Sequence, residues 1–202
     1  MRLALAFSRA VDAATTRLGR WVAWLVVVAA LVSAGNAIVR KVLDTSSNAW
    51  LEAQWWLFAM VFLFCSPWTL SSNEHIRIDI VNNTLPRWAR QAIEVVGHAL
   101  FLLPVAAVMV YTSLPFFLTS FHQNEQSSNA GGLPQWPAKF LIPLAFAILF
   151  VQGLSELIKR LAIIRGDLEE TASGGGHHAS AEAEAKRLLG EAETAPRTPH
   201  TK

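Results

Sequence analysis

The chain has 202 residues, of which 52% are hydrophobic and only 16% are charged, and its mean hydropathy is +0.33. Soluble domains carry about a quarter charged residues, so this composition excludes an ordinary soluble domain. The formal net charge is only +2, and the basic residues bracket apolar runs instead of clustering with aromatic residues on one element. This pattern argues against a nucleic-acid surface and indicates a small membrane protein whose surroundings are the lipid bilayer.

Four apolar runs decide the fold class. Each run is about 20 residues or longer, and about 20 apolar residues of helix cross a bilayer core of about 30 Å. We therefore predict an all-α integral membrane protein with four spanning helices, short interfacial amphipathic helices and a disordered C-terminal tail. The membrane domain is expected over residues 21–165, with spans at residues 21–39, 50–70, 93–118 and 138–164.

The segment before the first span is basic and amphipathic. Residues 1–20 carry four arginines with apolar side chains between them, which predicts a cytoplasmic helix lying on the membrane surface. A cleaved signal peptide is the alternative interpretation. The apolar run that begins near Trp21 is too long for that, and it ends at Arg40 and Lys41 without a small-residue cleavage site. Within this span, the small residues 33–35 suit close approach of another helix.

Tryptophan residues lie near the ends of the predicted spans. Their amphipathic rings favour the headgroup level of a bilayer. The predicted membrane anchors are Trp21, Trp50, Trp55, Trp56, Trp68, Trp88 and Trp136.

The third span and the tail differ from the other segments in composition. Pro104 and Pro115 are expected to bend the third span. Residues 166–202 are rich in glycine, alanine and glutamate, which is typical of a disordered segment, here expected on the cytoplasmic side.

The orientation follows from the lysine and arginine residues beside the spans, because cytoplasmic loops hold the excess. With the N-terminus inside, ten of these residues lie on the inner side and three on the outer side. The sequence therefore predicts a multi-pass protein with both termini in the cytoplasm.

The cytoplasmic connection over residues 71–91 is strongly polar. His75, Arg77 and Asp79 alternate with isoleucines, so they share one face if the segment is extended. This alternation predicts an interfacial segment with isoleucines in lipid and charges among headgroups.

Ionisable residues in or near membrane spans are costly and often functional. Glu52 opens the second span without a local cation, so a partner on another helix or subunit is expected. Glu94 and His98 share a helical face, and Glu156 lies three and four residues before Lys159 and Arg160. Near a span's end such groups reach water or pair locally.

Motifs for chemistry are absent from the sequence. No span carries ionisable groups through its middle, as an ion path or proton relay requires. The six histidines have no metal-ligand spacing, the single cysteine (Cys65) cannot form an intrachain disulfide, and no phosphate-binding glycine loop is present. We predict no catalytic, cofactor or metal residues, and a membrane scaffold or subunit that is not an enzyme.

Three stretches carry a family resemblance. They are "EHIRID" at residues 74–79, "LPRWAR" at residues 85–90 and "QSSNAGGLPQWPAKFLIPLAF" at residues 126–146. With Glu52 opening the second span and "LSELIKR" ending the fourth, the chain resembles the small membrane subunit of tripartite ATP-independent periplasmic (TRAP) transporters. The resemblance covers residues 21–165 and is greatest to the branch assigned to organic-acid transport.

The resemblance implies a sodium-driven importer of an organic anion in the bacterial inner membrane. A periplasmic binding protein would capture the carboxylate, and a large elevator-type membrane subunit would form a heterodimer with this chain. The chain itself would brace the large subunit and help to dock the binding protein. The candidate partner-interface residues are Glu52, His75, Arg77, Asp79, Arg87, Arg90, Glu125, Gly132, Pro134, Trp136 and Glu156.

Two other classes of protein stay open. A homo-oligomeric channel or exporter would present a polar stripe along a span, and none longer than one turn is found. A membrane anchor of a redox enzyme would hold haem between two histidines at similar depth, but His98 is the only histidine placed in a span.

Overall fold

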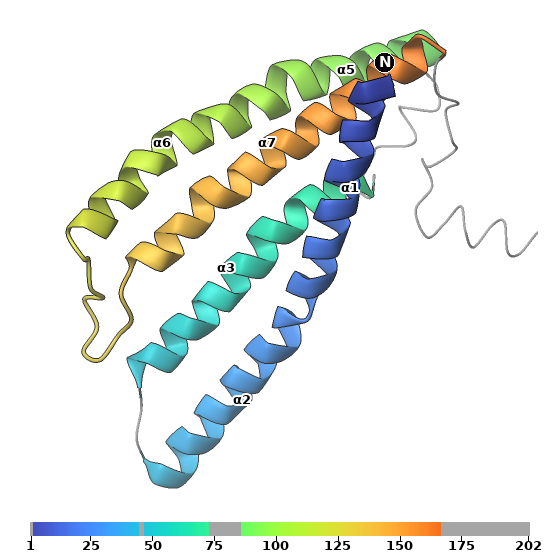
Figure 1. Cartoon of the computed structure of the whole chain (residues 1–202). Helices are drawn as coiled ribbons and strands as arrows, with labels where there is room; N and C mark the ends of the chain where they lie inside the picture. Colours follow the sequence, from blue (N-terminus) through green and yellow to red (C-terminus); the bar gives the residue numbers. More distant parts are fainter. Residues whose placement is uncertain (1, 45–46, 73–85, 167–202) are drawn as a thin grey trace, which may run out of the picture.

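A computed structural model describes residues 2–44, 47–72 and 86–166 of the chain, and every named element in it is a helix (Figure 1). The N-terminal helices are followed by one long helix, then by three consecutive helical segments, and then by another long helix. In chain order they are α1 (Arg2–Ala23), α2 (Leu25–Leu43), α3 (Asn48–Ser71), α5 (Arg87–Val96), the π-helix η1 (Gly97–Leu102), α6 (Leu103–His122) and α7 (Trp136–Ile164).

The expectation of an all-α protein with four spans is confirmed. Four helical stretches are long and apolar enough to cross a membrane: Leu3–Leu43, Asn48–Ser71, Trp88–His122 and Trp136–Ile164. The first and third have 41 and 35 residues, longer than predicted, because the helix continues without a loop through the neighbouring amphipathic segments α1 and α5. The orientation of the termini stays a prediction.

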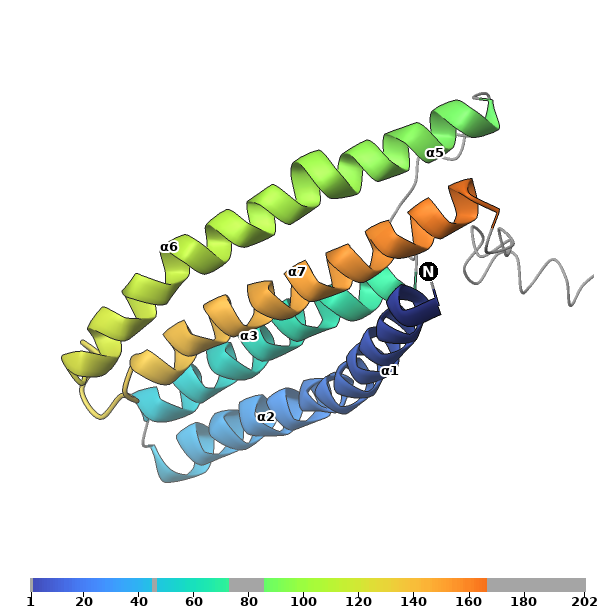
Figure 2. The same cartoon turned by 45° about the horizontal axis from the view of Figure 1, so that its top comes forward.

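The long helices form a layer and not a closed bundle. α6 packs on α7, α7 on α3, and α3 on α2, so that α6 and α2 lie at opposite edges (Figures 1 and 2). Of the most apolar window of α7, 39% is buried, compared with 6–11% for the other three spans. α7 is therefore the most buried of the four long helices.

α1 lies across the layer at one end. It meets α2 at a turn around Trp24 and packs on both α3 and α7. A small apolar core forms where these elements meet, from Val22, Phe64, Leu141 and Ala145. The predicted amphipathic segment is thus helical, and its place on a membrane surface stays a prediction.

The end of α1 approaches α3 through a glycine. A Cβ added at Gly19 would lie 2.6 Å from two atoms of the Trp68 ring, closer than real Cβ contacts come. Trp68 was predicted as a membrane anchor, and in the structure its half-buried ring packs against this glycine. Gly35, in the small-residue patch of α2, has no atom within 4 Å of an added Cβ among the described residues.

We expect Gly19→Ala to destabilise the fold by about 1–3 kcal/mol, because a rigid indole ring must move to make room for the methyl group. Thermal unfolding in detergent measures this, and limited proteolysis reports whether α1 leaves α3. Gly35→Ala is the matched control, with unchanged or slightly higher stability, since alanine favours helix over glycine. Equal effects of the two substitutions would contradict the packing described here.

The third span departs from regular α-helix before its first proline. Residues Gly97–Leu102 form a π-helix, and Pro104 follows directly at the start of α6. Proline has no N–H to donate and its ring crowds the carbonyl four residues earlier, so the preceding turn widens.

Candidate functional site

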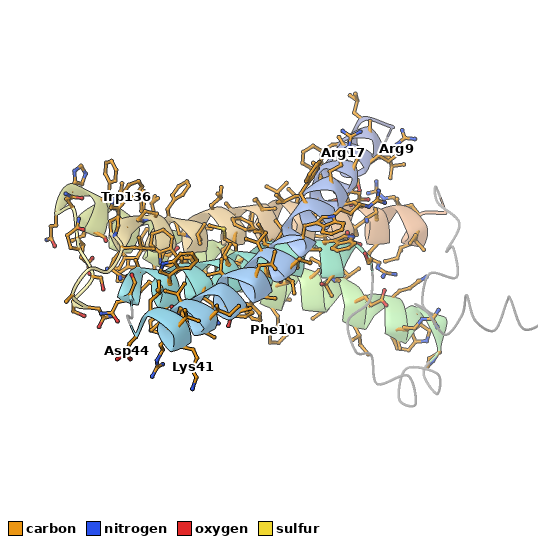
Figure 3. All side chains as sticks on the ribbon, turned by 90° about the horizontal axis from the view of Figure 1, so that it is seen from below. Arg9, Arg17, Lys41, Asp44, Phe101 and Trp136 are labelled. Carbon is orange, nitrogen blue, oxygen red and sulfur yellow. The ribbon has the colours of Figure 1, made fainter. Side chains whose placement is uncertain are left out.

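The charged side chains gather at the two ends of the molecule. Figure 3 shows Arg9 and Arg17 at one end and Lys41 and Asp44 at the other, with apolar side chains such as Phe101 between. The terminal end carries the start of α1 and the end of α7, and the loop end carries residues 123–135.

The loop end is organised around Glu52, which is only 2% exposed although it belongs to a predicted span. The Asn129 side chain donates to Glu52 Oε1 over 2.9 Å and the Leu133 backbone N–H donates to Oε2 over 2.6 Å. The Ser127 hydroxyl also donates to Oε1. This arrangement, named here the Glu52 clamp, holds the loop between α6 and α7 onto the start of α3.

The loop has the shape that the clamp requires. The Ser127 N–H donates to the Leu133 carbonyl over 3.2 Å, and Gly131 has a φ of +70°, a region that glycine adopts without strain. A Cβ added at Gly132 would lie 2.5 Å from Ser127 Cβ and 2.7 Å from Glu52 Oε1. Gly132 is therefore a close-approach position: it lets the backbone reach the carboxylate.

An ion pair lies beside the clamp. The Lys139 ammonium of α7 donates to the Glu125 carboxylate, and this hydrogen bond lowers the pKa of Glu125 below its ordinary value. The same ammonium lies 4.2 Å from the centre of the Phe116 ring of α6. At a partly exposed site such a pair contributes little to stability, and it fixes the loop to the start of α7.

The terminal end holds a buried polar network between α1 and α7. At its centre is Gln152, with no exposed surface. Its side chain accepts from Thr15 Oγ1 over 2.8 Å and donates to Asp12 Oδ1 over 2.8 Å and to Glu156 Oε1 over 3.1 Å. Every hydrogen-bonding atom of this amide has a partner, as buried polar groups require.

Two further contacts extend this α1–α7 network. The hydroxyls of Ser8 and Ser155 lie 2.7 Å apart, and both residues are almost fully buried. Lys159 Nζ donates to Asp12 Oδ2 over 3.0 Å and also pairs with Glu156. The predicted local partner Lys159 thus does pair with Glu156, but Asp12 of α1 shares the ammonium.

Arg160 has a different partner from the one its spacing predicts. Its Nη1 lies 2.7 Å from Glu94 Oε2 of α5, so the pair ties α5 to α7. His98 Nδ1 lies 2.7 Å from the Glu94 carbonyl oxygen, one turn earlier. Glu94 and His98 lie on the same face of the helix, and the Glu94 carboxylate pairs with Arg160 of α7.

The predicted partner-interface residues fall into four groups, two of which are the single residues Glu156 and Arg90. Glu52, Glu125, Gly132, Pro134 and Trp136 meet at the loop end, where Trp136 packs edge-on against Phe121 with ring centres 5.2 Å apart. Glu156 lies in the α1–α7 network, away from them. The third group falls outside what the structure describes: His75, Arg77, Asp79 and the side chain of Arg87. Arg90 lies on α5 and is half-buried.

Of the predicted anchors, Trp21, Trp50, Trp55 and Trp88 are exposed, with 46–77% of their surface accessible, which suits a bilayer interface. Trp56 and Trp136 are half-buried.

The main residues that sequence reasoning missed are those of α1 and α7: Ser8, Asp12, Thr15, Gln152 and Ser155. A signal was present. Ser8, Asp12 and Thr15 follow helical spacing, as do Gln152, Ser155 and Glu156, so each set lies on one helical face. The four arginines and the apolar side chains of residues 1–20 instead favoured a helix on the membrane surface over a helix that packs on another helix.

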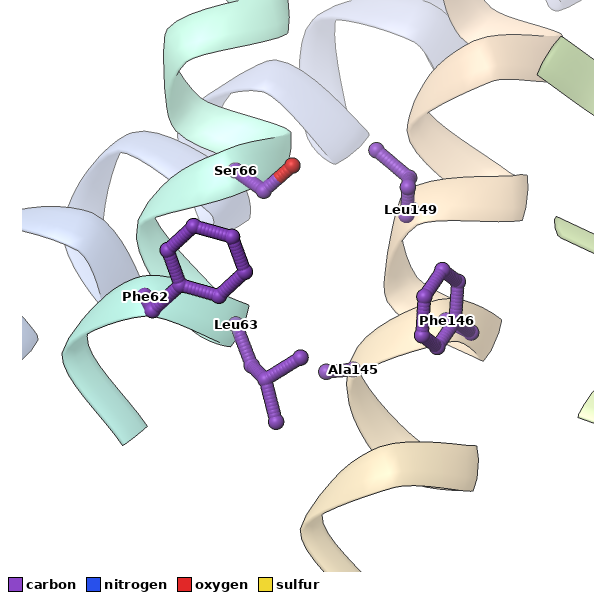
Figure 4. Close-up of a pocket in the computed structure, with 6 residues that line it drawn as sticks. All are labelled: Phe62, Leu63, Ser66, Ala145, Phe146 and Leu149. Carbon is purple, nitrogen blue, oxygen red and sulfur yellow. The ribbon is translucent and has the colours of Figure 1, made fainter. Parts of the chain in front are cut away.

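The described residues offer little for catalysis or metal binding. No group of three or more metal-ligating side chains is found among them. A hollow between α3 and α7 is lined by Phe62, Leu63, Ala145, Phe146 and Leu149 with Ser66 as its only polar side chain (Figure 4). Such a lining suits packing or an acyl chain and not a charged ligand.

The fold and these contacts define a class: a multi-pass membrane protein whose polar residues tie its own helices together. The comparison with protein families identifies it further. Residues 29–162 match the family model of the tripartite ATP-independent periplasmic transporters, DctQ component. The chain belongs to this family, and it is a small permease component of a TRAP transporter.

The family is one of transporter components and not of enzymes, and it implies association with the other TRAP components. No curated protein matches the chain significantly.

Proposed function

We propose that this chain is the static brace of a TRAP importer that takes up an organic anion, a carboxylate, with a sodium gradient. A large elevator-type membrane subunit would carry the substrate, and a periplasmic binding protein would deliver it. The chain would lie in the bacterial inner membrane with both termini in the cytoplasm.

One observation carries the bracing role: the buried polar and charged side chains Glu52, Gln152 and Glu156 are hydrogen-bonded within the chain. Gln152 joins α1 to α7, Glu52 holds the loop to α3, and Arg160 joins α7 to α5. A substrate or ion path needs polar groups left available along a span. Hydrogen bonds and an ion pair that join helices at both ends of the molecule suit a subunit that stays static while another subunit moves.

The proposed interfaces follow from this arrangement. At the loop end, the loop around Glu125, Gly132, Pro134 and Trp136 is offered to the binding protein. On the cytoplasmic side that the sequence predicts for them, His75, Arg77, Asp79, Arg87 and Arg90 are proposed to bind the large subunit and lipid headgroups. We assign Glu52 and Glu156 an indirect role: Glu52 holds the loop, and Glu156 bonds to Gln152 in the α1–α7 network.

The test is purification of the tagged full chain in mild detergent, followed by reconstitution of what is retained. We expect one large, very apolar multi-span protein at about one-to-one, and uptake of a carboxylate that needs the sodium gradient, the binding protein and this chain. Recovery of this chain alone as a defined homo-oligomer, or uptake unchanged without it, would overturn the proposal.

Neither alternative class gains a supporting observation. A channel needs a polar stripe, and a haem anchor needs two histidines at similar depth. Among the described residues, His98 and His122 lie at opposite ends of the third span, and the ring of His98 is engaged with the Glu94 carbonyl. An absorbance spectrum of the purified complex provides a direct check on haem.

A further inference from the structure

Tyr111 combines exposure, depth and chemistry in a way that no other described residue of α6 does. It is the only tyrosine of the chain, and 81% of its surface is exposed. α6 is an edge helix of the layer and packs on α7, so Tyr111 lies on a face that no other described element covers (Figures 1 and 2).

The predicted third span places this residue inside the bilayer. The span is expected to end at residue 118, about 10 Å of helix after Tyr111. The hydrocarbon core is about 30 Å thick, so the Tyr111 ring is expected within it. A tyrosine ring at a headgroup belt reaches water, and one within the hydrocarbon core does not.

Two polar groups of Tyr111, its hydroxyl and its backbone carbonyl, need hydrogen-bond partners inside the bilayer. Among the described residues the Tyr111 hydroxyl has no hydrogen bond. Pro115, four residues later and also exposed, has no N–H, so the Tyr111 carbonyl loses its usual helical donor. Lipid chains supply neither donor nor acceptor, and neighbouring helices are one source of partners for freed backbone groups in spanning helices, besides Ser and Thr side chains, ordered water and local helix adjustments.

The adjacent residue provides a contrast. Thr112 is exposed as well, but its hydroxyl donates to the Val108 carbonyl of its own helix over 2.8 Å. Its polar group therefore needs nothing outside α6. Exposure of a hydroxyl alone is not the signal. The signal is a hydroxyl and a freed carbonyl together within the hydrocarbon core.

From these observations we infer that the Tyr111 face of α6 binds a spanning helix of another protein. The inference rests on the proposed function, which supplies the partner: the large membrane subunit. The partner helix presents an acceptor to the Tyr111 hydroxyl and a donor to its carbonyl, as serine, threonine, asparagine and glutamine side chains do between spanning helices. Both groups then leave lipid on assembly.

The experiment is site-specific photocrosslinking in native membranes that contain the whole transporter. Tyr111→benzoylphenylalanine is compared with Leu31→benzoylphenylalanine, which lies on α2 at the opposite edge of the layer and is 68% exposed. We expect irradiation to join position 111 to the large subunit, identified by mass, and to give a much weaker adduct or none from position 31.

Several results overturn the inference while the large subunit still co-purifies. They are equal adducts from both positions, adducts from position 111 to lipid only, or adducts to a second copy of this chain. If no large subunit co-purifies with the unmodified chain, the proposed function fails and the inference fails with it.

A conservative variant gives a second measurement. Tyr111→Phe removes only the hydroxyl, and the retained fraction of large subunit in a detergent dilution series should fall about threefold, the effect of an average hydrogen bond between spanning helices. Thr112→Val is the control and should leave retention unchanged. Equal losses for the two variants, or none for Tyr111→Phe, count against the inference.

Discussion

Replacing Gln152 with leucine will loosen α1 from α7. The substitution removes three hydrogen bonds at a side chain with no exposed surface, and it leaves the Thr15 hydroxyl and the Asp12 carboxylate with fewer partners. We expect a loss of unfolding free energy of about 1–3 kcal/mol, the range for buried polar groups that lose their partners. Thermal unfolding and protease sensitivity of α1 measure it.

Two controls separate this effect from a general response to leucine. Gln123→Leu changes the same side chain at an exposed position beyond α6 and should alter stability little. A double-mutant cycle of Gln152→Leu with Thr15→Val isolates one bond, with a coupling of about 0.6 kcal/mol and no more than about 1.7 kcal/mol. A coupling of zero would contradict the described contact.

Removing the carboxylate of Glu52 will free the loop between α6 and α7. Glu52→Ala deprives the Leu133 N–H, the Asn129 amide and the Ser127 hydroxyl of their acceptor. We expect hydrogen exchange of the Leu133 amide to rise at least about tenfold, because a bond to a charged acceptor is lost. Uptake should fall where it depends on the binding protein, if this loop is the docking surface.

The neighbouring acid provides the matched control. Glu125→Ala breaks a partly exposed ion pair in the same loop and should change exchange at Leu133 far less. Glu52→Gln retains an acceptor oxygen, so its exchange rate at the Leu133 amide should lie between those of Glu52→Ala and Glu125→Ala. A loop that exchanges equally in Glu52→Ala and Glu125→Ala would show that the clamp does not order it.

The number of spans was predictable, and their arrangement was not. Apolar length decides whether a helix crosses a bilayer, and the four runs carry this information locally. Which helices pack together depends on small contacts distant in sequence, such as Gly19 against Trp68. The start of the first span at residue 21 stays a prediction: the arginines of α1 distinguish its composition from the apolar run that follows, although the helical stretch Leu3–Leu43 is continuous.

The polar ties were predictable only in part. Glu52 was predicted to have a partner on another helix or subunit, since a carboxylate in a span without a local cation is costly. Its partners lie instead on the loop between α6 and α7. Its donors were not foreseen, because they depend on the positive φ of Gly131 and the close approach at Gly132. Gln152 is uncharged and lies in an apolar run, and its helical spacing with Ser155 and Glu156 does not identify its partners on α1.

The α1–α7 network joins the first helix to the last helix that the structure describes, which has a consequence for biosynthesis. Ser8, Asp12 and Thr15 leave the ribosome long before Gln152 and Ser155 exist. During that interval their polar groups need water or headgroups, since lipid offers them nothing. An amphipathic first helix can wait at the bilayer surface. Its docking on α7 is then among the last steps in making the protein.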